Sequence, residues 1–159
     1  MCATKQTEFM QEAIRLSIEN VKSGKGGPFG AVIVKDGEII ARGANEVTSS
    51  GDPTAHAEVV AIRNACKALG TFQLDGCEIY TSCEPCPMCL GAIYWARPDK
   101  MYFANTKKDA ADINFDDQFI YDEIEIPFQN RKLITSQMMR EEALEAFQLW
   151  STSISKIEY

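Results

Sequence analysis

The chain has 159 residues, of which 45% are hydrophobic and 25% charged, a composition typical of one globular domain spanning 1–159. Its net charge of −7 argues against a broad nucleic-acid-binding surface, because such surfaces neutralise phosphates with Lys and Arg. We therefore expect a small uncharged substrate and no nucleic-acid partner. No apolar run approaches the roughly 20 residues that cross a bilayer, so we expect no membrane span.

The first third of the chain predicts a helix followed by a β-hairpin. Apolar residues recur at mostly three- and four-residue spacings over 7–21, which indicates an amphipathic helix that covers a sheet. Two short runs rich in β-branched residues, 29–34 and 38–41, flank the dipeptide Asp36-Gly37. Because this dipeptide suits the positive φ angles of a tight turn, the two runs are expected to pair antiparallel.

The middle of the chain alternates between helices and strands. Capping side chains at 52–54 precede a predicted helix over 55–69, and a strand at 77–81 precedes a second helix over 86–95. A further strand is expected at 100–104. Two strand–helix–strand units in succession imply a partly parallel sheet between helices.

The last third is patterned less clearly. Residues 106–117 form an Asp-rich stretch that we interpret as a loop, and 119–124 predicts a short helix. Residues 133–138 are expected to be a last strand or an extended segment, and 140–154 predicts a final helix. Together the elements predict an α/β fold with three α/β/α layers and a mixed five-stranded sheet between helices.

The expected compartment determines how the cysteines are interpreted. No apolar stretch follows Lys5, so the N-terminus does not resemble a secretion signal, and we expect a cytoplasmic protein. In a reducing compartment its six cysteines favour thiols or metal ligation over disulfides. Cys66 and Cys77 are expected to be small core residues and Cys2 a terminal thiol.

Two short motifs carry the chemistry, His56-Ala57-Glu58 and, about thirty residues on, Pro85-Cys86-Pro87-Met88-Cys89. They match the H-x-E and P-C-x-x-C signature of zinc deaminases. Cys86 and Cys89 lie one turn apart on one helical face. His56 and Glu58 would diverge by about 200° inside a helix, so only a first-turn position lets both face one site.

Three ligands from His56, Cys86 and Cys89 would leave a tetrahedral zinc with one open position, as in catalytic sites. Zinc lowers the pKa of a bound water toward about 7, and Glu58 is then expected to act as the general acid and base. Other interpretations exist: Glu58 could be a helix-start acid, and His56 a capped or core side chain. Cys83 could complete a closed, structural Cys3His site.

The sequence resembles the cytidine deaminase-like superfamily, in particular its guanine deaminase branch, over nearly the whole chain. The matching segments are GGPFGAVIVKDG (26–37), NEVT (45–48), DPTAHAE (52–58), YTSCEPCPMCLGAIYWA (80–96), FDD (115–117) and IEY (157–159). The resemblance implies Zn2+ ligation by His56, Cys86 and Cys89, a proton-shuttling Glu58, and a Cys83 that lies outside the metal shell.

The resemblance also implies five further roles. Phe29 would stack on a purine, Asn45 would hydrogen-bond it and Trp95 would form a wall of the pocket. Asp117 would be a second proton carrier that acts on the leaving amino group, and Tyr159 would close the site. From the residues alone, Phe29 and Trp95 could equally be core aromatics, Asn45 a turn residue and Asp117 a helix cap.

The same branch forms homodimers that exchange C-terminal segments, so 106–130 is the expected crossover. Phe147 and Trp150 would then be buried by the partner. The expected reaction is hydrolytic deamination of guanine to xanthine and ammonia. The alternatives are a tRNA adenosine deaminase, a deaminase of another purine or pterin-like base, and a non-catalytic zinc-stabilised binding module.

Overall fold

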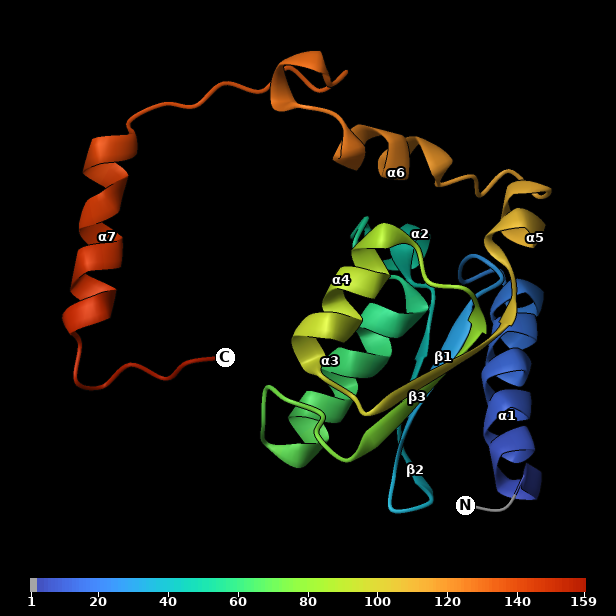
Figure 1. The fold of residues 1–159 in the computed structure, drawn as a ribbon. Coiled ribbons are helices and arrows are strands. Elements are labelled where there is room, and N and C mark those ends of the chain that lie inside the picture. Colours follow the sequence, from blue (N-terminus) through green and yellow to red (C-terminus); the bar gives the residue numbers. More distant parts are fainter. Residues whose placement is uncertain (1–2) are drawn as a thin grey trace. The chain divides into compact units, whose positions relative to one another are not determined.

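A four-stranded sheet with the strand order β2–β1–β3–β4 forms the centre of the fold (Figure 1). The computed structural model describes residues 3–159, so Cys2 lies outside the described residues. β1 pairs antiparallel with β2 and with β3, whereas β3 and β4 are parallel. The strands are β1 (Gly30–Lys35), β2 (Glu38–Ala44), β3 (Cys77–Cys83) and β4 (Lys100–Asn105).

The β1–β2 hairpin turns where the sequence predicts it. Asp36 and Gly37 have φ angles of 51° and 79°, and both positive values match the twist of a two-residue hairpin turn. The mixed sheet and the positions of its four strands confirm the predicted α/β class.

The sheet has four strands and not the five expected. Residues 133–138 form no strand in the part of the chain that the structure describes. The Ile134 side chain is 93% exposed, so this segment neither joins a ladder nor buries its apolar side chains. An apolar run predicts a strand only where a partner strand is available, and here none pairs with it.

Helices cover both faces of the sheet, giving the expected three layers (Figure 1). On one face lies α1 (Ala3–Lys22), whose Phe9 packs in a cluster with Val32, Val34 and Tyr80. The other face is covered by α3 (Ala57–Leu69) and α4 (Pro87–Ala96).

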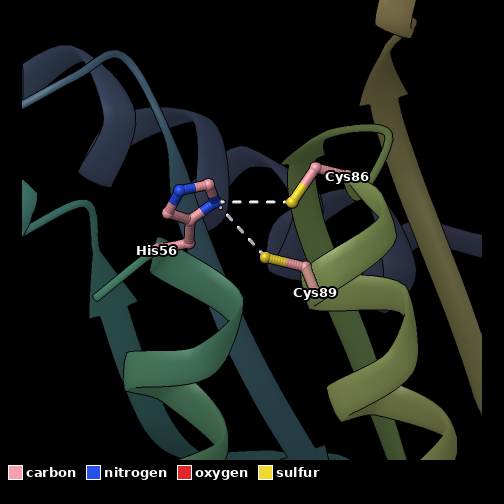
Figure 2. Close-up of side chains that lie close together, drawn as sticks. All are labelled: His56, Cys86 and Cys89. Carbon is pink, nitrogen blue, oxygen red and sulfur yellow. Dashed lines mark hydrogen bonds between the residues drawn. The ribbon is translucent and has the colours of Figure 1, made fainter. Parts of the chain in front are cut away.

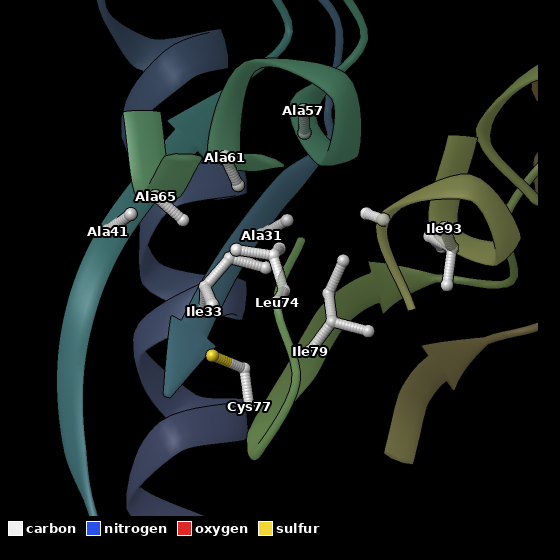
Figure 3. Packing of buried hydrophobic residues seen from close by; sticks show 11 residues of the cluster. Ala31, Ile33, Ala41, Ala57, Ala61, Ala65, Leu74, Cys77, Ile79 and Ile93 are labelled. Carbon is white, nitrogen blue, oxygen red and sulfur yellow. The ribbon is translucent and has the colours of Figure 1, made fainter. Parts of the chain in front are cut away.

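An alanine stripe lets α3 approach the sheet closely. Ala57, Ala61 and Ala65 recur every four residues on one side of the helix and belong to the buried cluster in Figure 3. A Cβ atom on Gly43 of β2 would lie 2.2 Å from the Ala57 carbonyl oxygen. The first turn of α3, which follows His56, is therefore seated directly against β2.

Two short helices lie in segments without a clear pattern, α2 (Val47–Ser50) and α5 (Lys107–Ala111). α5 starts at a capping box in which Thr106 accepts from the Asp109 backbone N–H and the Asp109 carboxylate accepts from the Thr106 N–H. The Asp-rich stretch is thus not a loop throughout, as the sequence had suggested.

Contacts divide the chain into two compact units, Met1–Asp117 and Gln118–Tyr159. The second unit contains α6 (Gln118–Glu125), the 3-10 helix η1 (Phe128–Asn130) and α7 (Arg140–Thr152). α6 and α7 confirm two predicted helices, yet no residue of this unit is buried. No helix among the described residues is long and apolar enough to span a membrane.

Candidate active site

His56, Cys86 and Cys89 meet at one point between the starts of two helices (Figure 2). The His56 Nδ1 atom lies 3.5 Å from the Cys86 Sγ and 3.5 Å from the Cys89 Sγ. All three potential ligand atoms lie within 4.8 Å of one another. His56 therefore forms one cluster with two cysteines that lie 30 and 33 positions further along the chain.

The helix starts explain why these side chains converge. His56 is the N-cap of α3 and Cys86 the N-cap of α4, each with an extended backbone and no side-chain bond to its own helix. Pro87 occupies the first helical position of α4, where its fixed φ suits the helix and its missing N–H is not needed. The predicted first-turn positions of both motifs are confirmed.

The turn before His56 differs from the sequence prediction in one detail. Asp52 does not cap α3; its Oδ1 atom accepts from the Thr54 N–H at 2.8 Å and from the Thr54 hydroxyl at 2.7 Å. Arg63 on α3 donates to the other carboxylate oxygen of Asp52 at 3.3 Å. Asp52 thus stabilises the turn that leads into His56.

The cluster is preset for a cation. Hydrogen bonds from Cys89 and then from His56 lower the pKa of Cys86 to about 4, which favours its thiolate at neutral pH. A hydrogen bond with Cys86 raises the pKa of His56, and a separate hydrogen bond with Cys86 raises the pKa of the Cys89 thiol. The two sulfurs and the imidazole thus share protons, and a bound divalent metal would displace those protons.

The donor set fits zinc. Nitrogen and sulfur donors are the set that tetrahedral zinc prefers. With Zn–S near 2.3 Å and Zn–N near 2.05 Å, a tetrahedral site would separate these atoms by about 3.5 Å. The observed N–S distances of 3.5 Å match that edge.

Glu58 lies buried beside this cluster in the first turn of α3, with 5% of its surface exposed. The Thr81 hydroxyl donates to its Oε1 atom at 3.1 Å, and the Cys89 thiol donates to its Oε2 atom at 3.4 Å. Burial raises the pKa of Glu58 above its ordinary value. A carboxyl with a raised pKa can both take and give a proton nearer neutral pH.

Cys83 lies outside the ligand cluster. Its Sγ atom lies 3.6 Å from the Thr106 carbonyl oxygen, and burial raises its pKa to about 11. Among residues 3–159, the group with convergent ligand atoms consists of His56, Cys86 and Cys89. The cluster thus offers three ligand atoms, the number found in open catalytic zinc sites, and Cys83 is not among them.

The predicted substrate residues are placed unevenly. Phe29 is half-buried and meets Phe115 edge to face, with ring centroids 5.0 Å apart. Phe115 belongs to the FDD segment at 115–117, in which the resemblance implied a role for Asp117 but none for Phe115. Asn45 is buried, and its Oδ1 atom accepts from the N–H groups of Gly27 at 3.4 Å and Val47 at 3.3 Å.

Asp117 is partly buried, and desolvation followed by the charge of Cys86 raises its pKa. Trp95 on α4 and Tyr159 in the second unit are exposed. The structure thus brings together the three ligands and Glu58, and it places Asp117 within electrostatic reach of Cys86. For Trp95 and Tyr159 the expected roles stay predictions.

A three-layer α/β/α fold with a His/Cys/Cys centre and a buried acid defines a zinc hydrolase site. Residues 3–105 match the family model described as the cytidine and deoxycytidylate deaminase zinc-binding region. The chain therefore belongs to the cytidine and deoxycytidylate deaminase zinc-binding family.

Relatives narrow this class. A guanine deaminase from Bacillus subtilis is 58% identical over 151 residues, which cover 95% of this chain and 97% of the relative. The X-ray structure of guanine deaminase from Bacillus subtilis has a TM-score of 0.95 at 56% identity and covers 100% of this chain and 99% of that one. A tRNA-specific adenosine deaminase from Aquifex aeolicus is 44% identical over 100 residues, 63% of this chain and 66% of the relative.

Proposed function

We propose that this protein hydrolyses guanine to xanthine and ammonia with zinc as its cofactor. The carrying observation is the His56, Cys86 and Cys89 cluster with the buried Glu58 beside it. The choice of guanine is supported by the 58% identity with a guanine deaminase across 95% of the chain. The likeness to a tRNA-specific adenosine deaminase covers only 63% and supports the same chemistry more than the same substrate.

His56, Cys86 and Cys89 would hold the zinc. When bound, zinc supplies a water whose lowered pKa makes it a nucleophile near neutral pH. Glu58 would take a proton from the attacking water and deliver it to a ring nitrogen of the purine, and the raised pKa of its carboxyl suits both transfers. Its burial keeps bulk water from competing for the proton.

Asp117 would carry the second proton, to the amino group that leaves. Its pKa is raised by desolvation, so a larger fraction of this carboxyl holds a proton than of an exposed Asp. The half-buried Phe29, braced edge to face by Phe115, offers an aromatic surface on which the purine can stack. Because backbone N–H groups engage the Oδ1 atom of Asn45, its Nδ2 amino group is the part that would donate to an acceptor on the base.

We further propose a homodimer that exchanges C-terminal segments, in which Tyr159 closes the site and Trp95 forms one of its walls. In support, none of residues 118–159 is buried, although Phe147 and Trp150 of α7 are large and apolar. Exposed apolar surface of this kind marks an interaction site. The cytoplasmic location and the single-domain organisation of 1–159 stay predictions.

The substrate is tested by incubating the purified protein with guanine, adenine, cytosine, their nucleosides and a tRNA anticodon stem-loop, and measuring ammonia and the deaminated product. We expect release from guanine alone, with little dependence on salt because no phosphate contacts are involved. Inosine formed in the stem-loop would favour a tRNA adenosine deaminase. No product from any substrate would contradict the enzymatic function.

The metal site is tested with a matched pair of cysteine variants. Cys86→Ser should lose bound zinc, because a serine hydroxyl is a poor ligand, whereas Cys83→Ser should keep the full zinc content. Zinc is measured by elemental analysis of the purified proteins. If Cys83→Ser loses the metal, the site is closed and a zinc-stabilised binding module becomes the better explanation.

A further inference from the structure

Thr81 occupies a core-facing position on β3, where an apolar side chain would be expected. On β3 it follows Cys77 and Ile79 in the alternation that faces α3 and α4, and both of those residues belong to the buried core. Thr81 is 1% exposed. Valine has nearly the same shape and would fill this space without a polar atom, so the hydroxyl calls for another explanation.

The hydroxyl has a partner in the site. Thr81 Oγ1 donates to the Glu58 Oε1 atom at 3.1 Å, which joins β3 to the first turn of α3. The other carboxylate oxygen, Oε2, lies 3.4 Å from the Cys89 Sγ atom and thus on the side of the ligand cluster. The two oxygens of Glu58 therefore face different surroundings.

Metal binding would sharpen this difference. A cysteine that ligates zinc is deprotonated and has no hydrogen to donate, so the bond from Cys89 to Oε2 is lost. The bond from Thr81 to Oε1 does not involve a ligand and is retained. The Thr81 hydroxyl then remains as the side-chain donor to the carboxylate, beside the backbone hydrogen bond of Glu58 itself.

We propose that Thr81 is a positioning residue: it holds Oε1 so that Oε2 is the oxygen that faces the metal centre and moves the proton. This inference rests on the proposed function, because it needs Glu58 to be the proton carrier. Glu58 acts only while the reaction proceeds, and the hydrogen bond described for the Thr81 hydroxyl goes to Glu58 and not to a predicted substrate residue. Loss of the hydroxyl should therefore lower kcat and leave KM nearly unchanged.

The experiment compares Thr81→Val with Thr81→Ser in the full-length, zinc-loaded protein acting on guanine. Thr81→Val should lower kcat by about 10- to 100-fold, the range expected for one hydrogen bond to a charged group. KM should change by less than about threefold, and Thr81→Ser should recover most of kcat. Zinc content should equal that of the wild type in both variants.

A crystal structure of zinc-loaded Thr81→Val gives a measurement that is independent of turnover. We expect the Glu58 carboxylate to be rotated from its orientation in Thr81→Ser. If Thr81→Val does not fold, Thr81→Ala against Thr81→Ser makes the same test, since these two differ only in the hydroxyl. Ser82→Ala is the control, because it removes a buried hydroxyl from the opposite face of β3, where Ser82 accepts from the Gly30 N–H.

Two outcomes overturn the inference: an unchanged kcat in the variant without the hydroxyl, or an unrotated Glu58 carboxylate. A loss of kcat in Ser82→Ala as large as in Thr81→Val would also overturn it, because β3 would then act only as a scaffold. Glu58→Gln separates this inference from the proposed function. If Glu58→Gln is inactive while Thr81→Val is normal, only the role of Thr81 is wrong; if Glu58→Gln is fully active, the proposed function fails.

Discussion

The two units of the chain differ in how much apolar surface they bury. Met1–Asp117 encloses an apolar core between a sheet and helices, and it contains every buried residue that the structure describes. Gln118–Tyr159 also contains α-helices but buries none of its residues. The first unit therefore has a core of its own and contains the metal cluster, whereas the second presents exposed apolar surface, which the proposed dimer would cover.

The largest effect should come from the buried acid of the first unit. Glu58→Gln keeps the shape of the side chain but cannot move a proton, so kcat/KM for guanine should fall by about 10²- to 10⁴-fold. Glu142→Gln removes an exposed acid from α7 in the second unit and serves as the control. Steady-state kinetics on both zinc-loaded variants makes the measurement, and a loss of less than about threefold in Glu58→Gln would contradict the assignment.

The second effect concerns the apolar surface of α7. Trp150→Ala should raise the dissociation constant of the proposed dimer by about 30-fold or more, since large aromatic side chains dominate such interfaces. Phe72→Ala removes an exposed aromatic of the first unit and should leave association unchanged. Analytical ultracentrifugation over a range of concentrations reports both. A wild-type protein that stays monomeric at high concentration would contradict the proposed dimer.

The sequence predicts the parts of the fold that depend on neighbouring residues better than those that depend on distant partners. Local signals were sufficient for the hairpin at Asp36-Gly37 and for the helix starts at His56 and Cys86, because each depends on neighbouring residues only. Of the two alternatives for 133–138, a last strand or an extended segment, the strand was wrong, since a strand needs a partner that no local pattern reveals. The start of α5 has a Thr106–Asp109 capping box that the Asp-rich composition concealed.

The site likewise contains residues that local motifs predict and one that they do not. The spacing within each motif identified His56, Cys86, Cys89 and Glu58, because helical geometry turns spacing into direction. Thr81 was not predicted: it lies 23 residues from Glu58, and only the packing of β3 against α3 brings them together. Sequence alone shows a helix and a strand at these positions, but not which of their side chains meet.

A third prediction tests the close approach that seats α3 in the first unit. A Cβ atom at Gly43 would lie 2.2 Å from the Ala57 carbonyl and 2.5 Å from the Ala61 nitrogen, both of them backbone atoms. Gly43→Ala should therefore destabilise the fold by about 1–3 kcal/mol through overpacking. Urea unfolding monitored by circular dichroism gives this free energy.

Gly91 on α4 is the matched control for that substitution. Nothing lies within 4 Å of a Cβ atom added there, so Gly91→Ala should stabilise the helix by about 0.5–1 kcal/mol. Opposite signs for the two substitutions are expected. If both stabilise the fold, β2 and α3 have room to separate, and the position of α3 is less fixed than the packing indicates.

The smallest effect should come from an ion-pair cluster that joins α1 to β2. The Glu12 side chain is 17% exposed and accepts from Arg15 at 2.7 Å and from Arg42 at 2.6 Å. The hydrogen bond from Arg15, with help from Arg42, lowers the pKa of Glu12 from 4.5 to about 2. Because both arginines are about half exposed, solvent screening limits the gain, and Glu12→Gln should cost about 0.5–1 kcal/mol at pH 7.

The pH dependence of that cost has a definite sign. A carboxyl whose pKa is lower in the folded state contributes its full stability above the unfolded value and loses it as the pH falls toward the folded value. The difference in unfolding free energy between wild type and Glu12→Gln should thus be constant above pH 4.5 and shrink toward pH 2. Asp112→Asn, which removes the exposed partner of Lys108, should produce a smaller difference throughout. A Glu12→Gln difference that persists unchanged down to pH 2 would mean that the glutamate stabilises the α1–β2 contact by its packing rather than by its charge.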